Sequence, residues 1–178
     1  MRSIFLAARF RWRLSIALFF VARLLFGSGD SALAVAPAGP GGATGLTLAP
    51  DLSFTDDSSS NFPIRGQNAD DGRIGSDRPT AIFFGTSHCW NTNREAERFV
   101  ALYATAKDKA RFLIVDLEHP SAEQRALVSR FYGGRIPTLA FLDRSGRVVY
   151  DEAGETSNRR GDSSRLEEIL AKASADSH

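Results

Sequence analysis

The stretch Pro79-Thr-Ala-Ile-Phe-Phe-Gly-Thr-Ser-His-Cys-Trp-Asn-Thr-Asn93 places an apolar run directly before a short polar turn and the chain's one cysteine. The run from Thr80 to Phe84 is continuous and largely apolar, which is typical of a strand buried on both faces. Cys89 follows at the mouth of a helix predicted over 91–107. A helix N-terminus presents free N–H groups and about half a positive charge, which favours a thiolate. This strand–turn–helix setting indicates redox chemistry at Cys89.

The chain beyond this stretch alternates strand and helix patterns. Further buried strands are predicted over 112–117 and 138–142, and a short one over 148–150 completes a hairpin. Helices are predicted over 120–131 and 164–173 from apolar residues at three- and four-residue spacing. Parallel strands need helical crossovers. The order therefore predicts an α/β fold, a mixed sheet of about four strands with helices on both faces. The charged run 94–98 is interpreted as a solvated helix face.

The segment Ile136-Pro-Thr-Leu-Ala-Phe-Leu-Asp-Arg-Ser-Gly146, together with Cys89 at the exit of the first strand, resembles the thioredoxin-like superfamily. The resemblance covers roughly residues 78–173 and implies a thioredoxin-like fold. It also implies a cis bond before Pro137, in a loop that lies against the cysteine. Ile136 would then offer its backbone to an extended substrate. Trp90 would stand on the rim of the same cleft, or pack on the domain's own loop.

The chain departs from that family at the residues that perform dithiol chemistry. Thr92 stands where the family has its second, resolving cysteine, and His88 replaces the tryptophan before the first. Phe83 replaces a buried acid, and Asn91 replaces the proline inside the motif. Thr92 is either a hydrogen-bond donor to the Cys89 sulfur or an ordinary first-turn residue. His88, when protonated, would add positive charge beside the thiol. The alternative for Cys89 is an unreactive leftover thiol.

Two functions remain open from the sequence. The first is thiol–disulfide exchange through Cys89 alone, with protein thiols or disulfides, or glutathione, as partners. The second is a non-catalytic module that binds an extended peptide near Cys89 and Pro137. No cofactor is expected, and three scattered histidines with one cysteine give no zinc-ligand spacing, so no metal is predicted. A net charge of +1 gives no sign of nucleic-acid binding.

Residues 1–34 have the pattern of a targeting segment. A basic region through Arg13 precedes an apolar stretch at 14–26, interrupted by Arg23, and the small residues Ala32-Leu33-Ala34 follow. This order predicts a secretory signal peptide cleaved after Ala34, and hence a periplasmic or extracellular protein. An uncleaved membrane anchor through residues 14–26 and an organelle transit peptide are the alternatives.

The remaining boundaries follow from composition. Residues 35–61 are rich in Gly, Pro and Ser and are predicted to form a flexible tether. Residues 62–77 are an ordered lead-in or an edge strand, and 78–178 form the thioredoxin-like domain. Limited proteolysis is accordingly expected to leave a core that starts between Ser60 and Arg78.

Overall fold

The computed structural model describes residues 44–68, 74, 77–154 and 157–175. The leader at 1–34, with its alternative interpretations as signal peptide, anchor or transit peptide, lies outside these residues. Within the described part of the chain, every helix is too short or too polar to cross a membrane.

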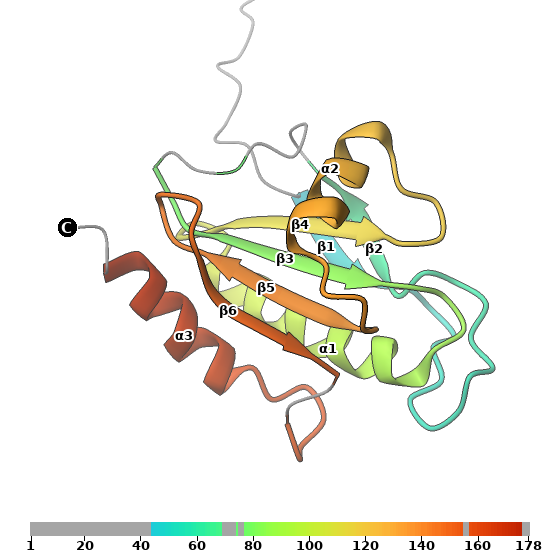
Figure 1. The fold of residues 1–178 in the computed structure, drawn as a ribbon. Coiled ribbons are helices and arrows are strands. Elements are labelled where there is room, and N and C mark those ends of the chain that lie inside the picture. The colour runs from blue at the N-terminus through green and yellow to red at the C-terminus, as the bar shows by residue number, and fades with distance from the viewer. Residues whose placement is uncertain (1–43, 69–73, 75–76, 155–156, 176–178) are drawn as a thin grey trace, which may run out of the picture. The chain divides into compact units, whose positions relative to one another are not determined.

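A four-stranded sheet with the order β4-β3-β5-β6 forms the centre of the fold (Figure 1). The central strand β3 (Thr80–Gly85) pairs in parallel with β4 (Arg111–Asp116). On its other side β3 pairs antiparallel with β5 (Thr138–Leu142), and β5 pairs antiparallel with β6 (Val148–Ala153). The predicted mixed sheet is therefore confirmed.

Three helices cover both faces of this sheet (Figure 1). They are α1 (Trp90–Ala106), α2 (Ala122–Phe131) and α3 (Ser164–Ala175). Because successive strand side chains point to opposite faces, β3 supplies Ala81 and Phe83 to one core and Ile82 and Phe84 to the other. The first core contains buried side chains of α1 and α3, and the second contains those of α2. Helices on both faces, as predicted, follow from this alternation.

The charged run 94–98 was expected to be a solvated helix face, and this expectation is wrong for two of its residues. Glu95 and Arg98 are each only 1% exposed, and Arg98 Nη1 lies 2.8 Å from Glu95 Oε2. Arg98 Nε also donates to the carbonyl of Asp162 at 2.8 Å. The pair is buried because the loop before α3 lies over this part of α1, which the i,i+3 spacing alone could not show. A buried charge needs such partners, since it costs free energy to remove it from water.

A two-stranded antiparallel sheet precedes the main one. It consists of β1 (Thr44–Leu48) and β2 (Ile64–Gln67). Leu46 and Ile64 are both 4% exposed and belong to the core on the α1 side. The structure thus differs from the flexible tether expected over 35–61. Residues 44–61 form β1 and most of a loop that is hydrogen-bonded to α1, while 35–43 lie outside the described residues. A strand with so few buried positions leaves no periodic signal.

The lead-in at 62–77 contains β2, which pairs with β1 and is not an edge strand of the main sheet. Just after β2, the side-chain amide of Asn68 donates to the carbonyl of Ile114 at 2.8 Å and accepts from its N–H at 2.9 Å. Both groups of Ile114 lie on the outer edge of β4. Asn68 therefore satisfies part of an edge that would otherwise be open to pairing with another chain.

The packing of β1 and β2 changes the expected result of limited proteolysis. We expect the resistant fragment to begin at or before Thr44, because Leu46 is buried and backbone bonds join β1 to β2. N-terminal sequencing and intact mass of the fragment measure this. A stable core that begins between Ser60 and Arg78 would contradict the structure.

The β5–β6 hairpin turns around the carboxylate of Asp143. Its Oδ1 accepts from the N–H groups of Ser145 and Arg147, at 2.9 and 3.0 Å, and from the Ser145 hydroxyl at 2.6 Å. The hydrogen bond from the Ser145 side chain leads the contacts that lower the pKa of Asp143 from 3.8 to about 2. The turn is therefore stabilised by the ionised carboxylate.

This lowered pKa gives a predicted dependence of stability on pH. The stabilisation should be complete above pH 3.8, the ordinary value, and be lost as pH falls through about 2. Asp143→Asn should reduce the free energy of unfolding at pH 7, and the difference from wild type should shrink as pH approaches 2. Urea unfolding across this range measures it, with Asp151→Asn on exposed β6 as the control. A constant difference at every pH would contradict the assignment.

Candidate functional site at Cys89

Three connecting segments meet at one end of the main sheet. Gly85, the last residue of β3, pairs with Asp116, the last residue of β4. Phe84 pairs with Thr138, the first residue of β5. The segment leaving β3 towards Cys89, the segment leaving β4 and the segment entering β5 after Pro137 therefore lie at the same end (Figure 1). The sheet register thus brings the predicted site residues Cys89 and Pro137 to the same end of the sheet.

Cys89 occupies the N-cap position of α1, with extended backbone (φ −143°) and a half-buried free thiol. Its carbonyl accepts the N–H of Asn93 at 3.1 Å, and its side chain makes no capping hydrogen bond. The preceding residue, His88, is exposed and has left-handed backbone, with φ at +50°. Such a conformation is uncommon outside glycine and turns the chain sharply before the helix. The thiol of Cys89 therefore lies at the start of α1 without capping the helix and without a disulfide partner.

Thr92 is fully buried one helical turn beyond Cys89. Its hydroxyl oxygen makes no hydrogen bond within the described part of the chain, so the donor role towards the Cys89 sulfur is not observed. Its methyl group instead packs close to Gly85, where an added Cβ would lie 2.7 Å from Thr92 Cγ2. Thr92 therefore fills the space of a resolving residue and supplies packing there.

Phe83, which the sequence resemblance places at the position of a buried acid, is fully buried. Its ring lies 5.5 Å from that of Phe99 and 6.1 Å from that of Phe62, the latter nearly edge-on. Edge-on and tilted contacts of this kind stabilise an apolar core. The place of that acid is therefore occupied by an aromatic cluster that cannot move a proton. The chain continues from the end of β3 into residues 86–90, which we call the Cys89 turn.

The loop joining β1 and β2 is fixed to the first turns of α1 by a buried polar network. Asn93 Nδ2 donates to the Ser53 carbonyl at 2.6 Å and to Ser59 Oγ at 2.9 Å. Ser59 Oγ also accepts the N–H of Ser53 at 2.6 Å. Asn93 is fully buried and Ser59 is 2% exposed. Sequence patterns missed this network because its partners are separated by more than thirty residues.

Two carboxylates accept hydrogen bonds from the backbone beside Cys89, and no sequence pattern predicts either contact. Asp57, on the β1–β2 loop, accepts the N–H of Trp90 at 2.9 Å. Glu118, on the β4–α2 loop, accepts the N–H of Ser87 at 3.0 Å. The hydrogen bond from the Ser87 backbone leads the causes that lower the pKa of Glu118, and the positive charge of His88 adds to it. Both side chains belong to loops outside the Cys89 motif.

The predicted binding residues lie around the same end. Trp90 is half-buried, and the guanidinium of Arg94 lies 5.6 Å from its ring centroid. Ile136 is 42% exposed, which is unusual for a large apolar side chain, while Pro137 is buried. The bond between Ile136 and Pro137 is cis, as the resemblance implies. The Pro137 carbonyl accepts the N–H of Gly154 at 2.8 Å, which fixes this segment to the end of β6.

One group of possible metal ligands lies beside the Cys89 turn. Among the described residues, Asp116, Glu118 and His119 have ligand atoms within 4.8 Å of one another. Asp116 Oδ1 accepts the N–H of Glu118 at 2.9 Å, and Asp116 Oδ2 lies 3.4 Å from His119 Nδ1. With Glu118 also bound to Ser87, these hydrogen bonds account for the arrangement without a cation. That the protein binds no metal stays a prediction.

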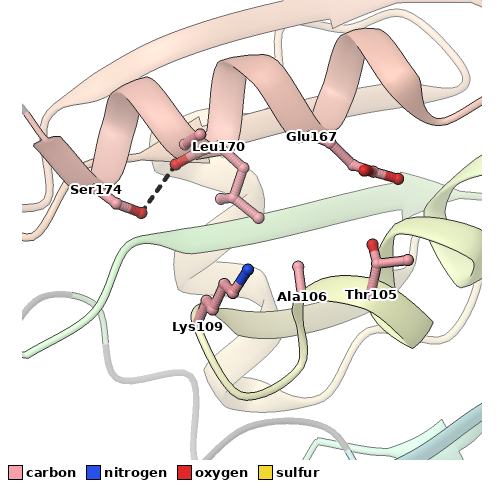
Figure 2. A pocket seen from close by; sticks show the side chains of 7 residues that line it. Thr105, Ala106, Lys109, Glu167, Leu170 and Ser174 are labelled. Carbon is pink, nitrogen blue, oxygen red and sulfur yellow. Dashed lines mark hydrogen bonds between the residues drawn. The ribbon is translucent and has the colours of Figure 1, made fainter.

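A small cavity lies away from this site, between the C-terminal part of α1 and α3. Its volume is about 160 Å³. Figure 2 shows its lining, which includes Thr105, Lys109, Glu167 and Leu170. Thr105 lies fifteen residues after Trp90, and at about 1.5 Å per residue this places the cavity roughly 22 Å from the start of α1. The cavity is therefore separate from Cys89.

The sheet order β4-β3-β5-β6 and the helices on both faces define a thioredoxin-like fold. No family model matches the chain, and no curated protein is significantly similar to it. Solved structures that it resembles include thioredoxin from Fasciola hepatica, with 17% identity, 55% of this chain and 83% of that chain covered, and a TM-score of 0.42. For thioredoxin from Malassezia sympodialis the values are 23%, 56%, 78% and 0.43. These likenesses concern the fold alone.

The close packing at Gly85 predicts a local cost of adding a methyl group. Gly85→Ala would place its Cβ 2.6 Å from Phe83 Cε1 and 2.7 Å from Thr92 Cγ2. We expect the variant to lose about 1–3 kcal/mol of unfolding free energy, as overpacked cores do. Urea denaturation measures the loss. Gly133→Ala is the control, because an added Cβ there meets nothing within 4 Å, and an equal effect of both substitutions would refute the packing argument.

Proposed function

We propose that the protein exchanges thiols and disulfides through Cys89 alone and forms a mixed disulfide with a protein client. The free, half-buried thiol at the start of α1, at the same sheet end as Pro137, supports this proposal. The observation that carries the single-thiol mechanism is Thr92, fully buried in the place of a resolving cysteine. No second cysteine exists in the chain to complete the exchange internally.

The exchange step follows from the chemistry of one thiol. The Cys89 thiolate attacks one sulfur of the client disulfide, and a new S–S bond forms as the old one breaks. The other client sulfur leaves as a thiolate and takes a proton from water. Because Thr92 cannot attack the mixed disulfide, release requires an external thiol. The protein is therefore suited to hold or isomerise a client and unsuited to reduce it by itself.

Export of the protein is part of the same proposal. The basic, apolar and small-residue order of 1–34 favours a secretory signal peptide, with a membrane tether through 14–26 as the alternative. An oxidising compartment would supply disulfide-bonded clients, since disulfides persist outside the reducing cytosol.

The second candidate is a module that binds an extended peptide without covalent chemistry. The exposed Ile136 beside buried Pro137 favours it, because exposed apolar side chains at a conformationally fixed segment are suited to contact a partner. Substitution of the thiol separates the two functions: binding by such a module would survive Cys89→Ser.

The decisive test uses a neutral small disulfide, bis(2-hydroxyethyl) disulfide. Wild-type protein should accumulate one adduct, detected by intact mass, and Cys89→Ser should form none. Thr92→Cys should instead close an internal disulfide and release the small thiol, because residues three apart at a helix start are close enough to bridge. Turnover of this variant with dithiothreitol should exceed that of wild type, yet stay slow because Phe83 supplies no proton-handling acid.

Thr92→Ser is the matched control, since it alters the same buried position and leaves a single thiol. It should behave as wild type and accumulate the adduct. If the wild-type thiol forms no adduct with the neutral reagent, the exchange function is wrong and the peptide-binding module replaces it.

A further inference from the structure

Two negative charges are bonded to the backbone on either side of Cys89. Glu118 accepts from the N–H of Ser87 at 3.0 Å, two residues before the cysteine. Asp57 accepts from the N–H of Trp90 at 2.9 Å, one residue after it. The two carboxylates come from different loops, 31 and 33 residues away from these partners in the sequence. Two acids that the Cys89 motif does not contain are thus bonded to the backbone just before and just after the cysteine.

The carboxylate of Asp57 also changes what the start of α1 offers to a ligand. The first N–H groups of a helix have no partner within the helix and attract negative charge. Here the first of them, that of Trp90, is already bonded to a carboxylate. The negative charge of Asp57 therefore offsets the positive end of the helix dipole. An anionic group on an incoming disulfide gains little attraction from this helix N-terminus.

The position of Asp57 is fixed by the contacts of its loop. The buried Asn93 and Ser59 hold the loop to α1 at 2.9 Å. The guanidinium of Arg160 lies 3.9 Å from the ring centroid of Phe54 in the same loop, and it bonds Glu97 of α1 at 2.8 Å through two nitrogens. These contacts hold the loop, and with it the backbone of Asp57, in place beside the start of α1.

Other charged side chains near the Cys89 turn also contribute to its electrostatic surroundings. Asp116 accepts the N–H of Glu118 and adds a third carboxylate. The exposed imidazoles of His88 and His119 act on Glu118 when protonated. Of the arginines, Arg94 lies over the Trp90 ring and Arg135 is exposed in the segment before Pro137. The carboxylates of Asp57 and Glu118 are bonded directly to the backbone of the Cys89 turn.

We propose that Cys89 exchanges preferentially with disulfides that have positive charge beside the sulfur atoms, such as cystines within basic protein segments. Disulfides flanked by carboxylates, which include that of glutathione, are disfavoured substrates. This inference rests on the proposed function and names the substrate class of the same site. The bonds made and broken are those of the exchange step above, and only the charge of the client differs.

The test compares two small disulfides of opposite charge. Cystamine carries two ammonium groups and dithiodiglycolate two carboxylates. Rate constants of adduct formation are measured by intact mass at pH 8 and low ionic strength. Because both reagents meet the same ionised fraction of Cys89, the ratio of the two rates reports the charge preference alone. We expect wild type to favour cystamine by on the order of tenfold beyond the ratio for a small neutral thiol, because the two carboxylates attract its ammonium groups and repel the carboxylates of dithiodiglycolate.

Isosteric variants assign the preference to the two acids. Asp57→Asn and Glu118→Gln keep an oxygen that accepts the backbone N–H and remove the charge. Each should lower the rate ratio by about threefold, and the double variant should approach the free thiol. Asp56→Asn is the matched control, because Asp56 lies on the same loop but accepts from Ser58 N and not from the Cys89 turn. It should change the ratio by less than Asp57→Asn does.

Raising the salt concentration tests the same inference on unaltered protein. At 1 M salt the screening length is about 3 Å, so the wild-type ratio should fall to that of the free thiol. A wild-type ratio equal to the free thiol at low salt, or one unchanged by the double variant, overturns the inference. The neutral reagent separates this failure from failure of the exchange function, because the adduct would still form with it.

Discussion

The fold depends on β3 being buried on both faces at the centre of the sheet. Phe83 and Phe84 are both fully buried, yet they point into different cores, so neither α1 nor α2 can be displaced without exposing an aromatic ring. Burying a side chain of this size contributes about 1.5–3 kcal/mol. The same strand ends at Gly85, and its pairing with β4 and β5 determines where the Cys89 turn must leave the sheet.

The site retains the position of a redox thiol while its surroundings differ from those of a dithiol enzyme. Thr92 fills the resolving position with packing, and Phe83 fills the position of the acid with an aromatic cluster. Neither residue can act as a second nucleophile or carry a proton. Under the proposed function, a single thiol in these surroundings would hold covalent partners rather than turn over rapidly, because no internal group displaces them.

The segment before the main domain extends the site. The β1–β2 loop is fixed by the buried Asn93 and brings Asp57 to the N–H of Trp90, while the β4–α2 loop brings Glu118 to the other side of Cys89. The electrostatic character of the thiol's surroundings is therefore set by loops distant in sequence. Under the proposed charge preference, the β1–β2 segment would help to select clients as well as cover the core.

The sequence by itself determined the main sheet, the three helices, the position of Cys89 and the replacement of the resolving cysteine by Thr92. It could do so because buried strands and amphipathic helices leave periodic patterns, and because motif residues are close along the chain. Only the tertiary structure decided that residues 44–61 form β1 and a loop bonded to α1, and that Glu95 and Arg98 are buried. It alone showed that Asp57 and Glu118 bond the Cys89 turn. These contacts join single polar residues across long sequence separations, and such pairs produce no local pattern before the chain folds.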